Sequence, residues 1–473
     1  MRDLFIGGVS WYTVFQCSLK ESHPMKKSLA ALFCVVIISA AQQHTLAENV
    51  IPNGDFAKGE VGKLPDGWTL VTPNPALAPT FQLVEENGKR FLTAKGNGRT
   101  QCFGLVKVPI TVVKDKTYRL TVRFKIEGIE DVNRHLVHGI FGDFNNGIFD
   151  YRREGDMIVG EHIFPSKGTK CEVQLHFRFS PEGKVWWEEI ILEECEPIAP
   201  RHVKIAITQG HHDLEWWKKF LDTAGEKKCD IALLREFFVD GTQEMDGPIV
   251  KMLGEKAKQW NMYVTCSLPL RRGDVVYNSA PLFDRQGNIV GIYDKVNLYD
   301  PELSQGTSPG ESVPVFETDF GTLGIMICYD SWHPAVAKLL SLKGAEIILC
   351  PNVGYYTQLM HARAADNGVV IAASSRDHPY GVWDAGGNLA GGASNDSSRY
   401  APSQIVDREE NAERNMQFVT VDLSIESSPH YWGGPMLSAP GGRRVRASGN
   451  FYLEDEIQKE VRRWETALPE KTP

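Results

Sequence analysis

Three polar residues that can do chemistry together stand at the ends of apolar runs in the second half of this 473-residue chain. Glu236 ends the run IALLRE, Lys295 follows the run GIYD, and Cys328 ends the run GIMIC. In an open α/β sheet, ligands collect outside the carboxyl ends of the strands, so polar residues at those ends are favoured as functional candidates. Taken singly, each has an ordinary structural explanation: a surface carboxylate, a solvated lysine and a small buried cysteine.

Together, these residue types offer acyl transfer through a thiol. A free thiol with a pKa of about 8.5 is mostly protonated at neutral pH, so it needs a base or a nearby cation to become a nucleophile. We expect Glu236 to accept the proton of Cys328 as the sulfur attacks a carbonyl or nitrile carbon. Lys295 is then the cation that stabilises the developing oxyanion.

The elements around these residues indicate an α/β fold. Continuous apolar runs at 203–210, 262–270 and 322–330 alternate with segments of helical character, such as 213–226 and 247–260. Continuous apolar strands separated by helices are typical of a sheet that is covered on both faces. Near the lysine, two strands flank the turn sequence DRQGN, which predicts a hairpin insertion.

The same region resembles the nitrilase superfamily, the carbon–nitrogen hydrolases. The resemblance lies in VKIAITQG (the family's first strand), LLREFF (its glutamate elbow), YDKVNLYDPE (its lysine element), GTLGIMICYDSWHP (its nucleophile elbow), HARAADNGVVIAAS (its arginine-rich helix and following strand), and WDAGGNLAG and QFVTVDLS (its closing strands). It covers about residues 203–424. It implies an α/β fold of the four-layer α-β-β-α sandwich type and a Glu236–Lys295–Cys328 triad that needs no metal and no organic cofactor.

The resemblance also implies a second glutamate shortly after the lysine. Glu302 is the best match and Glu311, in SPGES, is the alternative, while a surface loop carboxylate remains the other explanation of Glu302. Two positions depart from the family pattern. Arg235 stands where a proline is common before the glutamate, and Asn297 stands where the lysine element usually has a histidine. Neither departure removes a triad residue, and both are expected to reshape the wall of the site.

The family's reaction can be carried over to these positions residue by residue. After attack by Cys328, ammonia or an amine leaves and a thioester remains on the sulfur. Glu236, together with Glu302, activates the water that releases the acid. The backbone N–H of Tyr329, directly after the nucleophile, joins Lys295 in holding the oxyanion.

The residues after the cysteine give an indication of the substrate. CYDSWHP resembles the amidase and carbamoylase branches more than the true nitrilases, in which Trp-Glu usually follows the cysteine. An amide or an N-carbamoyl compound is therefore the predicted small-molecule substrate. Trp332, Tyr355 and Tyr356 are the residues expected to contact it.

Residues 48–196 have the pattern of an all-β domain. TYRLTVRFKI and CEVQLHFRFS alternate apolar and polar residues between turn signals, which predicts a β-sandwich. NGDFAKG, LPDGW and VWWEEIILEE resemble the galactose-binding-like jelly rolls used as carbohydrate-binding modules, which implies a glycan partner. Trp68, Trp186 and Trp187 could stack on sugar rings, although tryptophan in a jelly roll is more often a core residue. Since Trp186 and Trp187 alternate on one strand, at most one of them faces a ligand.

Residues 25–47 have the pattern of an export signal. Two lysines precede an apolar run at 29–41, and a small-x-small pattern follows before Glu48. The run of about 13 residues is shorter than the ~20 that a spanning helix needs. We therefore expect a secreted or periplasmic protein with no membrane span after cleavage, the alternative being an uncleaved anchor. Met25, which opens the signal, is the candidate start.

Charge and cysteine content argue against other classes. With 51 Lys plus Arg and 60 Asp plus Glu, the net charge is −9, which argues against a nucleic-acid partner. No CxxC and no Cys/His cluster with zinc-like spacing occurs, so no metal site is expected. Cys229, Cys266 and Cys350 lie in apolar runs and are expected to be buried core residues.

The predicted organisation has four parts. These are upstream residues with the signal (1–47), a carbohydrate-binding-like β-sandwich (48–196), a carbon–nitrogen hydrolase domain (202–430) and a C-terminal extension (431–473). Because nitrilase-like domains commonly pair through such extensions, we expect a homodimer by analogy. The predicted function is an exported hydrolase of carbon–nitrogen bonds other than peptide bonds. The alternatives are a non-catalytic glycan-binding or scaffold protein, and a sandwich with a purely structural or oligomerisation role.

Overall fold

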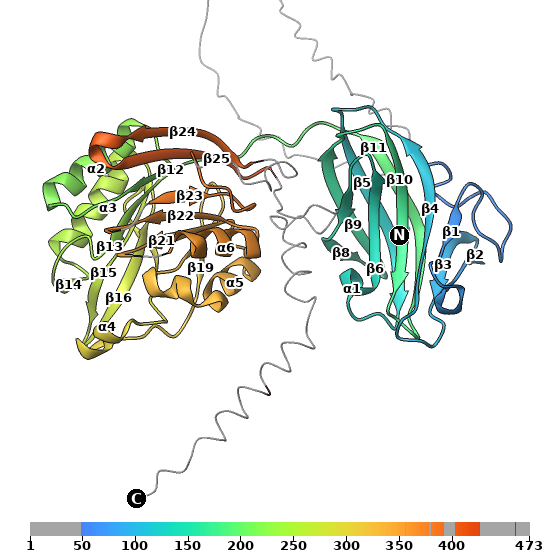
Figure 1. Cartoon of the computed structure of the whole chain (residues 1–473), viewed down its shortest axis with the longest axis horizontal. Helices are drawn as coiled ribbons and strands as arrows, with labels where there is room; N and C mark the ends of the chain where they lie inside the picture. Colours follow the sequence, from blue (N-terminus) through green and yellow to red (C-terminus); the bar gives the residue numbers. More distant parts are fainter. Residues whose placement is uncertain (1–48, 355, 378–379, 392–402, 426–458, 460–473) are drawn as a thin grey trace, which may run out of the picture. The chain divides into compact units, whose positions relative to one another are not determined.

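The computed structural model describes residues 49–354, 356–377, 380–391, 403–425 and 459. The predicted export signal and nearly all of the predicted C-terminal extension lie outside these residues. Two folded regions, a β-rich one and an α/β one, are described separately below (Figure 1). Within the described ranges, no helix is long and apolar enough to cross a membrane. Cys229, Cys266 and Cys350 are buried there, as expected, and each is a free thiol.

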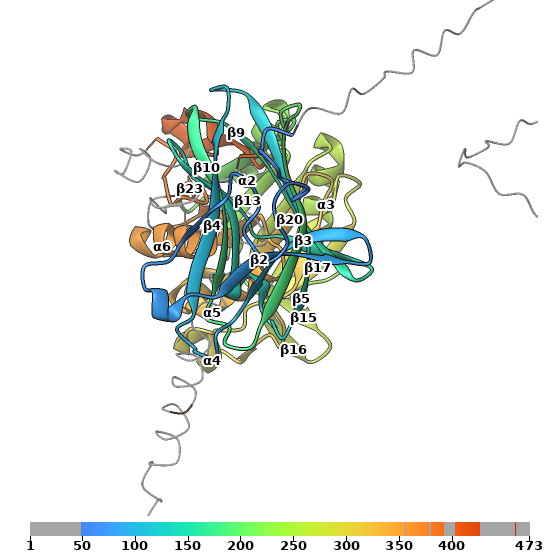
Figure 2. The same cartoon turned by 90° about the vertical axis from the view of Figure 1, so that its right-hand side faces the viewer.

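The first region is built from two antiparallel sheets (Figure 2). Its strands are β1 (Thr69–Val71), β2 (Thr80–Glu86), β3 (Lys89–Lys95), β4 (Phe103–Thr111), β5 (Thr117–Glu127), β6 (Leu136–Gly142), β7 (Asn146–Ile148), β8 (Tyr151–Glu154), β9 (Met157–Pro165), β10 (Lys170–Arg178) and β11 (Lys184–Glu194), with the helical turns η1 (Pro75–Leu77) and α1 (Val132–His135) between them. One sheet has the order β1-β4-β10-β6-β7, and the other has the order β2-β3-β11-β5-β9-β8.

Alternating side chains of these strands form one apolar core. Along β5, Leu120, Val122 and Phe124 are buried while their neighbours are partly exposed, which is the period of two that the sequence predicted. On β10, Val173 and Leu175 alternate in the same way. The all-β character expected of this region is therefore present, and its assignment to the jelly-roll class remains a prediction.

The three tryptophans that were considered for sugar stacking are all buried. Trp68 and Trp187 belong to the core, and Trp187 is fully buried. Trp186 lies outside that core but is only 7% exposed. The ammonium groups of Lys184 and Lys125 lie 3.9 and 4.8 Å from the centre of its ring system. The core explanation therefore holds for Trp68 and Trp187, whereas Trp186 is buried outside the core beside two lysine side chains.

A buried histidine organises the polar groups in this core. The Nε1 of Trp187 donates to Nε2 of His138 at 2.8 Å, and Nδ1 of His138 lies 2.9 Å from the hydroxyl of Tyr151. That hydroxyl donates to the carbonyl of Ile148 at 2.9 Å. Because Nε2 accepts, Nδ1 carries the proton, and the imidazole is held in its neutral form.

Acidification is expected to destabilise the sandwich through its histidines. Burial lowers the pKa of His138 to about 3 and the pKa of His162 and His176 to about 4. As the pH falls below about 6.5, these histidines bind protons in the unfolded chain but stay neutral in the folded chain. Each histidine therefore contributes a slope of about 1.4 kcal/mol per pH unit to the free energy of unfolding. Hydrogen exchange in peptides from β6 and β11, corrected for intrinsic rates, should show protection falling from pH 7 to 4.5. The decline should be shallower in His138→Gln, and pH-independent protection would contradict this account.

The second region begins with β12 (His202–Thr208). It continues with α2 (Leu214–Glu226), β13 (Ile231–Glu236), β14 (Gln243–Glu244), α3 (Pro248–Trp260), β15 (Tyr263–Arg272), β16 (Val275–Phe283), β17 (Ile289–Asp294), α4 (Asp300–Ser304), β18 (Thr307–Ser308), β19 (Val315–Glu317), β20 (Thr322–Ile325), η2 (Cys328–Trp332), α5 (Pro334–Leu342), β21 (Ile347–Pro351), α6 (Thr357–Asn367), β22 (Val370–Ser374), β23 (Gly381–Trp383), β24 (Ile405–Asn411), η4 (Ala412–Arg414) and β25 (Met416–Asp422).

Its strands form two sheets. The larger has the order β17-β16-β15-β13-β12-β25-β24, with β14 paired to β15 and β18 paired to β16, and the smaller has the order β19-β20-β21-β22-β23. The pairs β12–β13, β13–β15, β20–β21 and β21–β22 are parallel. Strands β16 and β17 form the antiparallel hairpin that the turn sequence DRQGN predicted.

Four layers result from the packing of helices on these sheets (Figure 1). Side chains of α2 and α3, such as Trp217 and Leu253, form one apolar cluster with β13 and β15 of the larger sheet. A second cluster lies between the two sheets, where Ile205 and Leu233 meet Ile325 and Leu349, and it extends to α5 and α6. The arrangement is the α-β-β-α order expected from the resemblance.

Candidate active site

Glu236 is the last residue of β13 and is buried inside the region. Every residue of this strand is buried, and the pairing of β13 with β15 shifts register between Leu233 and Glu236. The chain then leaves the sheet through Phe237, whose φ is 50°. A bulge changes the direction of the side chains at the end of a strand. Here it directs the carboxylate of Glu236, which is 1% exposed, toward Lys295.

Lys295 follows β17 and is also 1% exposed. Its N–H donates to the carbonyl of Asn278 at 2.9 Å, and its own carbonyl accepts from the N–H of Gly310 at 2.9 Å. A Cβ at Gly310 would come within 2.2 Å of the carbonyl oxygen of Asp294, so only glycine allows the chain to pass this close. The backbone around the lysine is therefore fixed from two sides.

The ammonium of Lys295 bridges two carboxylates. Its Nζ donates to Oε1 of Glu236 at 3.0 Å and to Oε2 of Glu302 at 2.6 Å. Burial by itself lowers the pKa of Lys295, but the charge of Glu236, with contributions from Cys328 and Glu302, outweighs burial and raises it. Lys295 is therefore a permanent cation at neutral pH.

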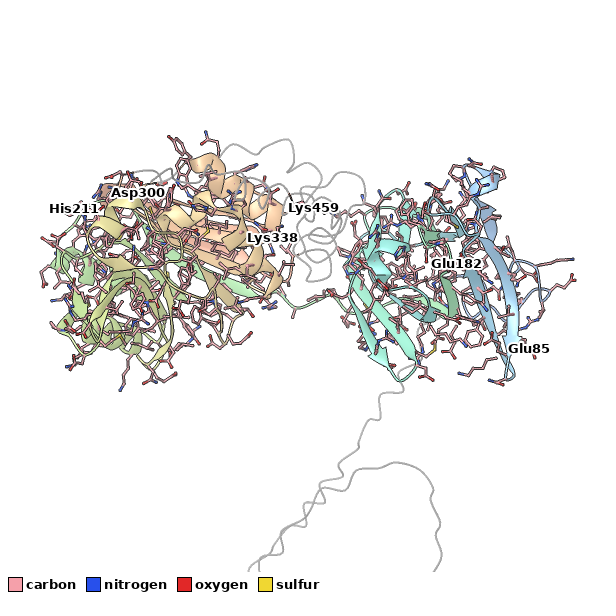
Figure 3. The ribbon with its side chains drawn as sticks, turned by 90° about the horizontal axis from the view of Figure 1, so that it is seen from below. Glu85, Glu182, His211, Asp300, Lys338 and Lys459 are labelled. Carbon is pink, nitrogen blue, oxygen red and sulfur yellow. The ribbon has the colours of Figure 1, made fainter. Side chains whose placement is uncertain are left out.

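Glu302 belongs to the short helix α4, whose first residue, Asp300, is labelled in Figure 3. Its Oε2 also accepts from the backbone N–H of Tyr299 at 2.9 Å, and the residue is 7% exposed. The alternative, Glu311, is exposed to solvent. Of the two carboxylates considered from the sequence, the structure places Glu302 beside the lysine.

Asn278, which the sequence did not single out, joins the two carboxylates. Its Nδ2 donates to Oε1 of Glu236 at 2.8 Å and to Oε1 of Glu302 at 2.7 Å. Its Oδ1 accepts from the hydroxyl of Ser267, which fixes the orientation of the amide. Both side chains are buried. The only signal in the sequence is a polar Asn-Ser pair inside an otherwise apolar strand.

Cys328 lies at a sharp turn between β20 and the helical turn η2. Its φ is 44°, in the left-handed region, which costs a non-glycine residue about 1–3 kcal/mol. Burial and the neighbouring Glu236 raise the pKa of the thiol well above its ordinary value, although Lys295 opposes them. The resting sulfur is therefore a thiol, and it donates to the carbonyl of Gly354 at 3.8 Å.

A buried aspartate connects the nucleophile turn to the lysine element. Asp330 accepts from the N–H of Ile327 at 2.9 Å and from the hydroxyl of Tyr293 at 2.7 Å. It also accepts from the backbone N–H and the side-chain amide of Asn297, at 3.0 and 2.9 Å. Asn297, noted as a departure from the family pattern, therefore links the segment of Lys295 to the turn of Cys328.

Arg235, the other departure, is turned inward. Its guanidinium is 2% exposed and donates to the carbonyls of Glu236, at 2.6 Å, and Phe237. It also donates to Nδ1 of His211, which is labelled in Figure 3, at 2.9 Å. Burial, with repulsion from Arg376, lowers the pKa of Arg235 to about 10. The arginine therefore ties down the backbone carbonyls at and after the end of β13.

The structure describes two of the three residues that are expected to contact the substrate. Trp332 ends η2, is 45% exposed, and its carbonyl accepts from Arg363 of α6 at 3.4 Å. Tyr356 immediately precedes α6 and is 58% exposed. Tyr355 lies outside the described residues. Tyr329 directly follows the nucleophile in η2, and the role of its N–H at an oxyanion remains a prediction.

This arrangement can do covalent chemistry at a thiol. It holds a thiol, a carboxylate beside it, a fixed cation and a second carboxylate within one buried network. Among the described residues, no group of three or more His, Cys, Asp and Glu side chains could hold a metal ion.

Comparison with known proteins places the second region in a family. The carbon–nitrogen hydrolase family model matches residues 202–455, which is more than half of the chain. The match begins at the predicted start of the hydrolase domain and extends into the segment 431–473.

Curated relatives match part of the chain. The chain is 32% identical to the citrullinase of Francisella tularensis over 148 residues, covering 28% of this chain and 52% of the relative. It is 31% identical to the probable nitrilase C965.09 of Schizosaccharomyces pombe over 140 residues, covering 28% and 51%. The chain thus spans about half the length of the curated relatives it matches.

Among solved structures, the chain is similar to Nit3 of Saccharomyces cerevisiae, described as a member of branch 10 of the nitrilase superfamily. The TM-score is 0.40 at 19% identity, and the match covers 48% of this chain and 92% of Nit3. On the match of the family model, this chain belongs to the carbon–nitrogen hydrolase family.

Proposed function

We propose that this chain hydrolyses a carbon–nitrogen bond other than a peptide bond, in an amide or an N-carbamoyl compound, through a thioester on Cys328. The observation that carries the proposal is the buried network in which Lys295 bridges Glu236 and Glu302. Cys328 adjoins it on a turn with a left-handed φ. Relatives named omega-amidase and deaminated glutathione amidase support the amide class.

In the first half of the reaction, the sulfur of Cys328 attacks the carbonyl carbon while its proton moves to Glu236. The electron pair of the C=O bond moves to oxygen, and Lys295 and the N–H of Tyr329 stabilise that negative charge. When the tetrahedral intermediate collapses, the C–N bond breaks and Glu236 returns the proton to the leaving nitrogen. The raised pKa of Lys295 suits this role, because the lysine stays positively charged throughout.

In the second half, water attacks the thioester. Glu236 takes a proton from the water, the C–S bond breaks, and the proton passes to the sulfur as the acid leaves. Glu302 and Asn278 hold Lys295 and Glu236 in place through this exchange, because each contacts the network directly. The raised pKa of Cys328 means that the thiolate is a good proton acceptor at this step.

Ammonia or amine release tests the proposal. A panel of simple amides, N-carbamoyl compounds and nitriles should give release from the parent protein and none from Cys328→Ala. Release from amides or N-carbamoyl compounds and not from nitriles is the expected ranking. Hydrolysis that survives in Cys328→Ala would overturn the thioester route.

Arg235 is expected to act on the rate of reaction and not on substrate binding. Arg235→Ala leaves the carbonyls of Glu236 and Phe237 without their donor, and small misplacements of a catalytic group cost up to about 100-fold. We expect kcat to fall about 10- to 100-fold while KM changes less than about twofold, with partial recovery in Arg235→Lys.

A matched control is available in the sandwich. Arg178 also donates to two backbone carbonyls, those of Arg134 and Asn133. Arg178→Ala should lower the midpoint of thermal unfolding without changing kcat. If Arg235→Ala lowers the unfolding midpoint and leaves kcat unchanged, the arginine is only a structural residue.

Export, the homodimer and the glycan partner stand as further proposals. The pattern of residues 25–47 supports cleavage before Glu48 and a secreted or periplasmic location, which N-terminal sequencing of the mature protein tests. Pairing of two chains rests on analogy with the family and is tested by the mass in solution. Glycan binding by residues 48–196 rests on the resemblance and draws no support from the three buried tryptophans. Retention on a polysaccharide column tests it.

A further inference from the structure

Four aromatic side chains form a continuous row beside the nucleophile. Tyr299, Tyr329, Trp332 and Tyr356, here called the aromatic row, touch in sequence. The ring centres of Tyr299 and Tyr329 lie 5.7 Å apart, those of Tyr329 and Trp332 lie 6.2 Å apart, and those of Trp332 and Tyr356 lie 5.0 Å apart. The row therefore presents one apolar surface that several segments build together.

Each member of the row is tied to a residue of the site. The N–H of Tyr299 donates to the carboxylate of Glu302. Tyr329 and Trp332 belong to the same helical turn as Cys328. Tyr356 follows two residues after Gly354, whose carbonyl accepts from the thiol of Cys328. The positions of these rings are therefore set by the same backbone segments that position the triad.

Three of the four members of the row are exposed to solvent, and Tyr329 is partly buried. Tyr299 is 55% exposed, Trp332 is 45% exposed and Tyr356 is 58% exposed. Trp186 of the sandwich offers a contrast, because two lysine ammonium groups cover its ring. Contiguous exposed aromatic surface marks a place where an apolar group binds, and flat groups gain most because rings stack or meet edge to face.

We propose that the aromatic row binds a flat apolar group of the substrate, so that the preferred substrates are amides or N-carbamoyl compounds carrying an aryl group. The inference rests on the proposed function and names its substrate class. Tyr329, the second member of the row, directly follows Cys328 in the chain, so an aryl group lying on the row would be connected to the attacked carbonyl by a short spacer. A substrate group is favoured as the occupant because Tyr329 and Trp332 share the helical turn of Cys328, and Tyr356 lies two residues after Gly354, which contacts its thiol.

The test compares two amides that differ in one phenyl group, 3-phenylpropionamide and propionamide. The parent protein should prefer the aryl amide in kcat/KM. Trp332→Ala and Tyr356→Ala should each lose about tenfold in kcat/KM for 3-phenylpropionamide and less than about twofold for propionamide. Phe179→Ala is the control, because Phe179 is 48% exposed but lies in the sandwich, and it should change neither value.

Three results would overturn the inference. One is an equal loss for both amides, and another is a parent protein that prefers propionamide. The third is activity that depends on protein concentration in the parent and not in Trp332→Ala, which would make the row an interface between copies. A glucosamine-derived amide in the same panel distinguishes aryl binding from sugar stacking, and preference for it would also contradict the aryl assignment.

A second readout separates this inference from the proposed function. Alkylation of Cys328 by iodoacetamide is followed by peptide mass spectrometry with and without 3-phenylpropionamide. The aryl amide should protect Cys328 in the parent and not in Trp332→Ala, even if no amide is hydrolysed. Protection without turnover would contradict the proposed function alone, whereas turnover without selective protection or aryl preference would contradict the aromatic row alone.

Discussion

Replacing Glu236 with glutamine is expected to lower kcat/KM for the hydrolysed amide by about 10³-fold or more. The variant keeps the size of the side chain but removes the group that takes the thiol proton. General acid–base catalysis contributes about 10²- to 10⁴-fold in enzymes, and here one carboxylate serves both halves of the reaction. Burial raises the pKa of the thiol, so it needs a base to become a thiolate at neutral pH. Initial rates of ammonia release over a range of substrate concentrations measure the effect.

A matched control for this variant lies three residues after the end of β18. Glu311 was the alternative to Glu302 in the sequence, and it is exposed. Glu311→Gln makes the same chemical change outside the network and should leave kcat/KM within about twofold of the parent value. If Glu236→Gln retains more than a tenth of the parent activity, the base must be a different group.

Replacing Lys295 with methionine is expected to damage both activity and stability. The loss of an oxyanion donor costs about 3 kcal/mol of transition-state stabilisation, or roughly 10²-fold in rate. In addition, Glu236 and Glu302 would stay buried without the ammonium group that compensates their charge. Both would still accept a hydrogen bond from Asn278. Removing one partner from a buried ionic group costs about 3–5 kcal/mol of folding free energy. Urea unfolding and ammonia release measure the two effects separately.

Two companion variants test the electrostatic reason for that instability. Lys295→Met combined with Glu302→Gln removes one of the two carboxylate charges and should recover part of the folding free energy without recovering activity. Lys107→Met is the control, because Lys107 forms a 2.7 Å ion pair with Glu172 that is about one-third exposed and should contribute less than about 1 kcal/mol. Unchanged stability in Lys295→Met would contradict the bridging role of the ammonium.

The sequence predicted the parts of the site that stand at strand ends. Glu236, Lys295 and Cys328 each follow an apolar run, and polar residues just beyond strand ends are favoured as functional candidates. Glu236 and Lys295 lie at strand ends of the larger sheet, whereas Cys328 follows β20 of the smaller one. Glu302 was predicted from the resemblance, with Glu311 left as the alternative. The layered α/β order followed from continuous apolar strands separated by helices.

The supporting network could not be predicted in the same way. Asn278 lies inside β16, and its place beside both carboxylates depends on the register of β16 against β15. Asp330 depends on how the turn after Cys328 folds back on the lysine element. The inward turn of Arg235 depends on the bulge in β13. Such contacts depend on the register between strands and on the path of the turns, which the periodicity of a single sequence does not determine.

The same limit applies to the sandwich. Alternation along β11 correctly indicated that Trp186 and Trp187 point to opposite faces of the sheet. It did not reveal that Lys125 and Lys184 cover the outward ring. Whether an aromatic side chain is open therefore depends on neighbours from other strands, which composition and spacing leave undetermined.

The thioester on Cys328 is the central claim, and peptide mass spectrometry of protein quenched in acid during turnover tests it most directly. The account predicts that the peptide containing Cys328 gains the mass of the acyl group, that no other cysteine peptide does, and that the adduct disappears when substrate is exhausted. Ammonia release by Cys328→Ala, or turnover by the parent with no acyl adduct on Cys328, would contradict it.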